Sequence, residues 1–321
     1  MRPASPNLRL FLIWIALAGF PFVAPNDYII NLGVVLFINV ILIASLNLIM
    51  GVGGQLSLGH GGFYGLGAYI SGVLAAKFGV SPWLSGPAAI ALTAVAALVI
   101  GLPTLRLRGH YLAMATVGFN AILVVLFNQL VWLTGGPNGL TGVPSFSVAG
   151  FAFNTDARFF YLAWLFALLV MLAAFNIVDS RFGRGLRALS NSEIAAECFG
   201  VNTYAHKLVI FVVTAAMAAL AGVLYVHYVN FASPESFSFF VSVLLVVMVA
   251  LGGMGNSWGP PIGALVYTVV PEALRSVEDL EIFAFGASMI VVLLFFPRGI
   301  CGGIAKLWRL AMPDSKAGSH E

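Results

Sequence analysis

Apolar runs of about 14 to 24 residues follow one another along most of the chain, separated by short stretches rich in glycine, proline and charge. Such runs are typical of transmembrane helices, which need roughly 20 apolar residues to cross the hydrocarbon core. The first half predicts spans at Leu10–Val23, Tyr28–Met50, Leu56–Ala76, Pro82–Leu105 and Tyr111–Leu133. The second half predicts spans at Phe159–Ile177, Leu208–Phe231, Phe237–Leu251, Trp258–Pro271 and Ile282–Pro297. The pattern predicts an all-α polytopic membrane protein with about ten transmembrane helices.

The composition excludes the other broad classes. Of the 321 residues, 60% are hydrophobic and 8% charged, and the mean hydropathy is +1.00. An ordinary soluble domain is about a quarter charged, and a disordered chain needs low hydrophobicity and high charge. The net charge of +3 is too small for a nucleic-acid binder. Two cysteines, Cys198 and Cys301, are too few for a disulfide framework.

The positive charges orient the predicted spans. With the N-terminus inside, 12 of the 15 lysines and arginines fall on the inner side, and only Lys77, Arg158 and Arg275 fall outside. The positive-inside rule then places both termini in the cytoplasm. The first 25 residues also resemble a signal peptide, with Arg2 and Arg9 before an apolar run, but further spans follow at once. We therefore expect a retained first span.

The positions of the charged residues also bear on the energy source that a transporter would use. Every charged residue fits in a loop or at the end of a span, whereas many ion-coupled transporters carry a charge inside the membrane as the coupling element. The chain also has no P-loop and no recognisable set of metal ligands. We expect no cofactor or metal on this chain, and energy supplied from elsewhere. Sodium sites built from carbonyl and hydroxyl groups keep an ion-coupled transporter as an alternative.

The longest cytoplasmic loop, residues 179–207, contains one short helical pattern. Ser190 to Phe199 holds good helix formers, and Ser190 with Glu193 three residues later reads as a capping box. Gly200 then predicts the end of the helix. The small pair Ala195 and Ala196 would allow a partner surface to approach closely. A solvated connecting loop with one helical turn is the alternative.

Two glycine-rich segments are expected on the inner side. The first, residues 51–69, carries Gln55, Ser57 and His60 among its glycines. Glycines at this density permit either close helix packing or a broken helix that lines a substrate path. A histidine at the membrane interface with a satisfied hydrogen bond is the alternative for His60. Residues expected at a path or gate are Gln55, Ser57, His60, Asn47, Asn120 and Ser257.

The second segment, residues 252–260, loosely echoes the first and suggests an internal repeat. It also spells G-x-S-x-G around Ser257, a motif of serine hydrolases. That motif needs a strand, a turn and a helix in an α/β sheet, a pattern that this chain lacks. An intramembrane hydrolase is therefore the least favoured of the functions considered. The chain is not expected to be an enzyme.

Several motifs, in one order and covering nearly all of the chain from Tyr28 to Ile300, carry a family resemblance. They are GVGGQLSLGHGGFYGLGAY at 51–69, LRLRGHYLAMATVGF at 105–119, LTGGPNGLTGVP at 133–144, SRFGRGLRALSNSEIAAECFGVN at 180–202, SPESFSF at 233–239, LGGMGNSWGPPIGA at 251–264 and FFPRGI at 295–300. The chain resembles the permeases of branched-chain amino acid ABC importers, most closely the LivM-type subunits.

The resemblance implies a permease of the bacterial inner membrane. The expected partners are a second permease subunit, two cytoplasmic ATPases that bind ATP and Mg²⁺, and an extracytoplasmic solute-binding protein. The resemblance also implies a loop of the form E-A-A-x-x-x-G that docks on the ATPase. Gly200 sets its register and places Ile194 at the glutamate position, which departs from the motif. The expected coupling residues are Glu193, Ala195, Ala196, Glu197, Gly200, Arg184 and Arg187.

The expected domains are an N-terminal segment with the first span (1–27), a permease domain (28–300) with coupling loop 179–207, and a cytoplasmic tail (301–321). Leucine, isoleucine and valine are the substrates that the resemblance implies. Related permeases carry urea, amides or other small organic solutes, and these remain alternatives.

Overall fold

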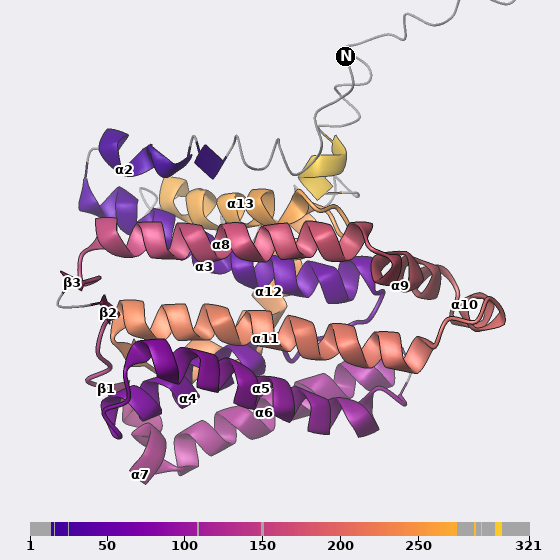
Figure 1. The fold of residues 1–321 in the computed structure, drawn as a ribbon, viewed down its shortest axis with the longest axis horizontal. Helices are drawn as coiled ribbons and strands as arrows, with labels where there is room; N and C mark the ends of the chain where they lie inside the picture. Colours follow the sequence, from indigo (N-terminus) through magenta and orange to yellow (C-terminus); the bar gives the residue numbers. More distant parts are fainter. Residues whose placement is uncertain are drawn as a thin grey trace, which may run out of the picture.

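A computed structural model of the chain describes residues 14–15, 17–24, 26–107, 109–148, 151–274, 286, 290 and 299–303. Within these ranges, long helices run antiparallel and gather the loops at two opposite ends (Figure 1). These helices are α3 (Asp27–Leu46), α4 (His60–Ala76), α5 (Pro82–Thr104), α6 (His110–Gln129), α8 (Asp156–Asp179), α11 (Thr203–Val229), α12 (Phe239–Gly252) and α13 (Gly259–Leu274).

Short elements occupy the ends and the joints of this bundle. They are α2 (Phe20–Val23), the π-helix η1 (Asn47–Val52), α7 (Val131–Thr134), η2 (Gly136–Asn138), α9 (Arg181–Asn191), α10 (Glu193–Cys198) and η3 (Pro234–Phe237). The strands are β1 (Leu140–Thr141), β2 (Ser147–Val148), β3 (Phe151–Ala152) and β4 (Phe231–Ala232). We call the end that carries the strands the outer end, and the end from which α9 and α10 project the inner end (Figure 1).

Five of the described helical segments are long and apolar enough to cross a membrane. They are Asp27–Val52, Pro82–Thr104, His110–Gln129, Asp156–Asp179 and Thr203–Val229. The helices α4, α12 and α13 have 17, 14 and 16 residues and are shorter than a full span. The prediction of a helical, multi-pass membrane protein is therefore confirmed.

Two kinds of difference separate the predicted spans from these helices. The span predicted at Leu56–Ala76 begins too early, because residues 54–59 are not helical and α4 starts at His60. Gly54 is responsible in part, since its φ of +64° cannot continue a right-handed helix. The predicted span Ile282–Pro297 falls almost entirely outside the described residues, and the first four residues of Leu10–Val23 also lie outside them.

Small residues let α11 pack into the centre of the bundle. A Cβ on Gly67 of α4 would overlap the carbonyl of Ala219, and one on Gly222 would overlap the carbonyl of Tyr64. In lipid, helices associate through close van der Waals packing rather than through the hydrophobic effect. The glycines and alanines of α4 and α11 therefore bring the two backbones into contact and position the start of α4.

The outer end is closed by a small, well-bonded cap. Strand β1 pairs antiparallel with β4, with Leu140 opposite Ala232. Asn230, in the left-handed conformation with φ of 59°, donates from its side-chain amide to the carbonyl of Val143 at 2.8 Å. The glycine-rich segment from Thr134 to Pro144 contains η2 and β1, and Gly135, Gly136, Gly139 and Gly142 all have a positive φ.

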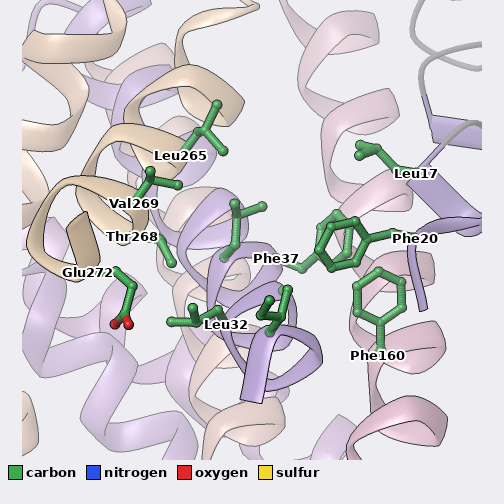
Figure 2. A pocket seen from close by; sticks show the side chains of 12 residues that line it. Leu17, Phe20, Leu32, Phe37, Phe160, Leu265, Thr268, Val269 and Glu272 are labelled. Atoms are coloured by element: carbon green, nitrogen blue, oxygen red, sulfur yellow. The ribbon is translucent and has the colours of Figure 1, made fainter. Parts of the chain in front are cut away.

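A cavity of about 410 Å³ opens between α2, α3, α8 and α13 (Figure 2). Its wall includes Phe20 and Phe160, whose rings stack 5.8 Å apart, together with Leu32 and Leu265. Glu272 supplies the charged group, and it accepts a hydrogen bond of 2.5 Å from the Tyr28 hydroxyl. A wall so largely apolar suits alkyl chains and not the two charges of an amino acid.

Candidate functional site

The helical structure is interrupted between η1 and α4, at residues 53–59, which we call the break segment. Its backbone is held at both ends: Gly53 N–H donates to the carbonyl of Leu48 at 3.0 Å, and Leu58 N–H donates to Thr116 Oγ1 at 3.1 Å. A Cβ on Gly59 would lie 2.7 Å from the carbonyl oxygen of Thr116. The break segment therefore runs directly against α6, as in the interrupted helices that line substrate paths in transporters.

His60, the first residue of α4, bonds to α3. Its Nε2 lies 2.9 Å from Ser45 Oγ, and the same Oγ lies 2.7 Å from the carbonyl oxygen of Leu42. A hydroxyl has one proton to donate and a carbonyl can only accept. Both contacts are satisfied when Ser45 donates to Leu42 and His60 Nε2–H donates to Ser45. This assignment leaves His60 Nδ1 as a bare acceptor.

Asn120 and Ser242 meet on the other side of the α4 N-terminus. Ser242 Oγ accepts from the backbone N–H of Gly61 at 2.9 Å, and Asn120 Nδ2 donates to it at 3.5 Å. Asn120 and Ser242 have no exposed surface. The start of α4 is therefore held by polar groups from α3, α6 and α12, inside a bundle that is otherwise apolar. We call Ser45, His60, Thr116, Asn120 and Ser242 the polar seam.

Several buried polar atoms in this region have no hydrogen-bond partner. Among the described residues they belong to Gln55, Ser57, His60, Thr93 and Asn120. An unsatisfied buried polar group costs about 1–3 kcal/mol. Four of these five residues are expected path residues, all but Thr93. The unpaired atoms of Gln55, Ser57, His60 and Asn120 can accept or donate hydrogen bonds to a polar solute.

Asn47 and Ser257 are placed differently. Asn47 Nδ2 donates to the carbonyl of Asn256 at 2.9 Å, while its Oδ1 accepts from Gly255 N–H at 2.8 Å. A Cβ on Gly51 would overlap the backbone of Gly255. The two glycine-rich segments therefore lie against each other, and the amide of Asn47 is used to clamp them. Ser257 is half-buried in the turn after α12.

The described contacts provide no nucleophile–base pair for Ser257. In the described part of the chain no hydrogen bond joins it to a histidine: His60 bonds to Ser45, and His227 bonds to Ser71 and to the carbonyl of Pro144. A serine hydrolase needs its base within hydrogen-bond reach of the nucleophile. The G-x-S-x-G run therefore forms a tight turn here and not a catalytic elbow.

The loop at residues 179–207 folds as two helices, where one was expected. Ser180 caps α9 by accepting from Gly183 N–H at 3.1 Å, and Ser192 caps α10 by accepting from Ala195 N–H at 3.3 Å. The predicted capping box from Ser190 is wrong, because Ser190 lies inside α9 and Glu193 is the first residue of α10. A second serine two residues later offers the better cap. Gly200 ends the helix with a φ of +79°, as its residue type predicts.

The exposed surface of α10 is apolar on one side. Ile194 is 71% exposed and Phe199 is 88% exposed, whereas Ala196 is only 2% exposed. Ala195 lies at the surface between them. Ala195, Ile194 and Phe199 can therefore contact a partner, while Ala196 supports the helix from below. Arg184 and Arg187 are exposed on α9, and Arg184 Nη1 donates to the carbonyl of Asp179 at 3.2 Å.

Two contacts tie α10 to α11, and a third joins α9 to the break segment. Lys207 Nζ lies 2.6 Å from Glu193 Oε1, and Thr203 Oγ1 donates to Glu197 Oε1 at 2.7 Å. A Cβ on Gly54 would lie 2.6 Å from Ser190 Oγ. The last turn of α9 therefore packs directly against the break segment.

No group of three or more His, Cys, Asp and Glu side chains that could hold a metal ion is found among the described residues. Both cysteines are free; Cys198 is exposed and Cys301 is buried. Burial raises the pKa of the Cys301 thiol.

Nothing in the sequence around some residues of the site points to their role there. Ser45 reads only as one polar residue within a span, and Ser242 is a lone serine at the head of an apolar run. Phe199 and Ile194 look like the apolar side of a helix, and only the fold leaves them at the surface. Lys207 closes the loop in the sequence, and its pairing with Glu193 depends on how α10 turns back.

An antiparallel bundle of apolar helices, interrupted by a segment lined with unpaired polar groups, is the arrangement of a membrane transport protein. Residues 28–293 match the family model described as "Branched-chain amino acid transport system / permease component". The chain belongs to this family.

Relatives with curated names are also permeases of branched-chain amino acid transport systems. The chain is 32% identical over 317 residues to the high-affinity branched-chain amino acid transport system permease protein LivM of Escherichia coli K12, covering 91% of this chain and 74% of the relative. It is 31% identical to LivM of Salmonella typhimurium, covering 92% and 74%. It is also 29% identical over 274 residues to LivH of Escherichia coli K12, covering 79% and 88%. No solved structure matches the chain.

Proposed function

We propose that this chain is a permease subunit of an ATP-driven importer and forms part of the path for branched-chain amino acids. One observation carries the proposal: buried, unpaired polar atoms of Gln55, Ser57, His60 and Asn120 gather where α4 begins. Leaving such atoms unpaired costs stability, and a polar solute that passes them satisfies their hydrogen bonds. The family of the chain supports the choice of solute.

Energy enters through the cytoplasmic loop in this proposal. Partner ATPases bind ATP and Mg²⁺, and this chain binds neither. An ATPase surface covers the exposed Ile194, Ala195 and Phe199 of α10. The ion pair of Glu193 with Lys207 passes the motion of α10 to α11, and the contact of Ser190 with Gly54 passes it to the break segment. The bundle then alternates between inward-open and outward-open states.

The charge distribution supports this energy source over ion coupling. In the long described helices of the bundle, charged residues lie near the helix ends, as Asp27, Asp156, Asp179, Lys207 and Glu272 do. A proton-coupled carrier would need a titratable group in the middle of a span. The charge distribution does not distinguish between solutes, and the match to branched-chain amino acid permeases favours these amino acids over urea or amides.

The proposed assembly has four kinds of component: this permease, a second permease subunit, two ATPases and an extracytoplasmic solute-binding protein. Matches to both LivM and LivH relatives support a pair of unlike permeases. In the proposed topology the chain has ten spans in the bacterial inner membrane, with both termini in the cytoplasm. Its permease domain covers residues 28–300, between an N-terminal segment (1–27) and a cytoplasmic tail (301–321).

Uptake of labelled leucine by cells with and without the gene, at low substrate concentration, tests the function. Urea and an aromatic amino acid are measured in parallel. We expect deletion to abolish leucine uptake, and the uptake to be sensitive to ATP depletion but not to an ionophore. Intact leucine uptake with loss of another solute would reassign the cargo. Collapse with the ionophore alone would replace the importer with an ion-coupled carrier.

A further inference from the structure

A polar cavity of about 240 Å³ lies at the inner end, between the break segment and helices α9 and α10. Its wall is made by residues 53–56, the start of α6, the end of α9, Glu193 and Lys207. It differs in kind from the apolar cavity of Figure 2, which lies among α2, α3, α8 and α13. It shares no residue with the polar seam, and Gln55 is the one expected path residue in its wall.

The cavity presents both signs of charge. Lys207 Nζ and Glu193 Oε1 lie 2.6 Å apart, and their side chains are 10% and 26% exposed. Removing two charges from water carries a desolvation penalty that their mutual attraction does not always repay. A zwitterionic ligand can insert between Glu193 and Lys207, because its two charges then pair with both side chains.

Gln55 adds an unpaired amide to the same wall. It is 5% exposed, and neither its Nε2 nor its Oε1 has a hydrogen-bond partner in the described structure. An amide with both ends free can donate to a carboxylate and accept from an ammonium group. Leu56, Leu112 and Leu189 complete the wall with aliphatic surface. One cavity therefore offers an anion site, a cation site, an amide and a hydrophobic lining.

We infer, on the basis of the proposed function, that this cavity binds a free amino acid with an aliphatic side chain from the cytoplasmic side. The ammonium group binds Glu193, the carboxylate binds Lys207, and the leucines surround the side chain. Drug-sized ligands occupy pockets of about 300–1,000 Å³, and this cavity is below that range, which suits a single amino acid. Glu193 is the first residue of α10, so the bound amino acid acts on the coupling helix, and accumulated product slows import.

Binding of labelled leucine to the purified, complete transporter in nanodiscs, without the solute-binding protein, tests this site. We expect saturable binding that leucinol, which lacks the carboxylate, and 4-methylpentanoate, which lacks the ammonium group, compete for at least about tenfold more weakly. We expect the double variant Glu193→Gln/Lys207→Met and the single variant Gln55→Leu each to lower the affinity about tenfold or more. The double variant removes both charges together, which avoids leaving one buried and unpaired. Gln129→Leu, an exposed glutamine at the outer end of α6, is the matched control and keeps the wild-type affinity.

The outcomes are separable from those of the proposed function. Leucine uptake by cells with no leucine binding to the complex would overturn the inference and leave the function standing. So would binding that survives both cavity variants but is lost in Asn120→Leu, because the ligand would then sit at the polar seam. Equal competition by leucinol and leucine would also overturn it. A transporter that moves a different solute and not leucine would remove the proposed cargo, and with it this site.

Discussion

Ser190, in the last turn of α9, packs directly on Gly54 of the break segment: a Cβ on Gly54 would lie 2.6 Å from Ser190 Oγ and 3.0 Å from Ser190 Cα. Gly54 also has a φ of +64°, a conformation that side chains with a Cβ rarely adopt. Backbone conformation and close packing therefore both require glycine at this position.

We expect Gly54→Ala to abolish most uptake. The left-handed conformation costs an alanine about 1–2 kcal/mol, and its methyl group pushes α9 away from the break segment. Labelled-solute uptake, normalised to the amount of protein in the membrane, measures the effect. Gly79→Ala is the matched control, because Gly79 has a φ of +65° and nothing within 4 Å of a Cβ. Equal loss in both variants would mean that backbone strain, and not the contact with Ser190, is responsible.

We expect Ile194→Arg and Phe199→Arg to disrupt docking of the ATPase subunits without unfolding the chain. Both side chains are largely exposed on α10, so the membrane domain tolerates the change, while a buried arginine at the centre of an interface costs about 2 kcal/mol or more, roughly 30-fold in affinity. Co-purification of the ATPases measures the interaction.

Two controls accompany these docking variants. Phe78→Arg, at an outer-end position that is 66% exposed, retains the ATPases. Ala196→Arg behaves differently again: because Ala196 is 2% exposed, it unfolds α10 and lowers the yield of protein. Normal co-purification of the ATPases with Ile194→Arg and Phe199→Arg would place the docking surface elsewhere.

We expect Asn120→Leu to separate stability from function. Asn120 is fully buried, and its Oδ1 has no partner in the described structure. Leucine at this position gives up the 3.5 Å hydrogen bond from Nδ2 to Ser242 Oγ but removes the unpaired Oδ1, whose desolvation costs about 1–3 kcal/mol. The thermal midpoint should therefore stay unchanged or rise. Uptake should fall sharply because the path loses an acceptor.

Asn128→Leu is the control for Asn120→Leu. Asn128 lies two turns further along α6, and its amide donates to the carbonyl of Val124 at 2.8 Å. It should lose a little stability and retain transport. A strongly destabilised Asn120→Leu protein with normal uptake per folded molecule would show that Asn120 is structural.

We expect Gly222→Ala to lower the yield of folded protein severely. A Cβ at this position would overlap the carbonyl of Tyr64 and lie 2.8 Å from the Ala68 backbone nitrogen, so α4 and α11 must separate. Gly118→Ala, in α6 with nothing within 4 Å, should be stabilised by about 0.5–1 kcal/mol through helix propensity. Size-exclusion profiles and thermal midpoints of the two variants in detergent compare them directly. Similar behaviour of both variants would contradict the close packing of α4 on α11.

Most of the architecture was predictable from the amino-acid sequence because the bilayer imposes a simple rule. A segment that crosses lipid must satisfy its backbone hydrogen bonds within itself and present apolar side chains. Long apolar runs therefore predicted α3, α5, α6, α8 and α11 to within a few residues. The first four residues of the span predicted at Leu56–Ala76 were placed wrongly, because glycines serve a tight helix contact and a break equally well.

The sequence by itself also singled out Gln55, Ser57, His60 and Asn120, since polar residues are conspicuous in a chain this apolar. Which of them keep unpaired atoms was decided only by the tertiary structure. Asn47 looks like Asn120 in the sequence, yet its amide is fully used by the backbone at Gly255 and Asn256. The difference depends on groups about two hundred residues away along the chain.

The coupling loop shows the same division. Gly200 is a local signal and predicted a helix that ends where α10 ends, whereas the start was placed two residues too early because both Ser190 and Ser192 can cap a helix. Which side of that helix faces outward depends on where α11 packs, so the sequence could not separate the buried Ala196 from the exposed Ala195. Local backbone preferences and hydrophobicity act within a few residues and can be read along the chain. Burial, pairing and exposure depend on contacts between distant segments, and these exist only once the helices have packed.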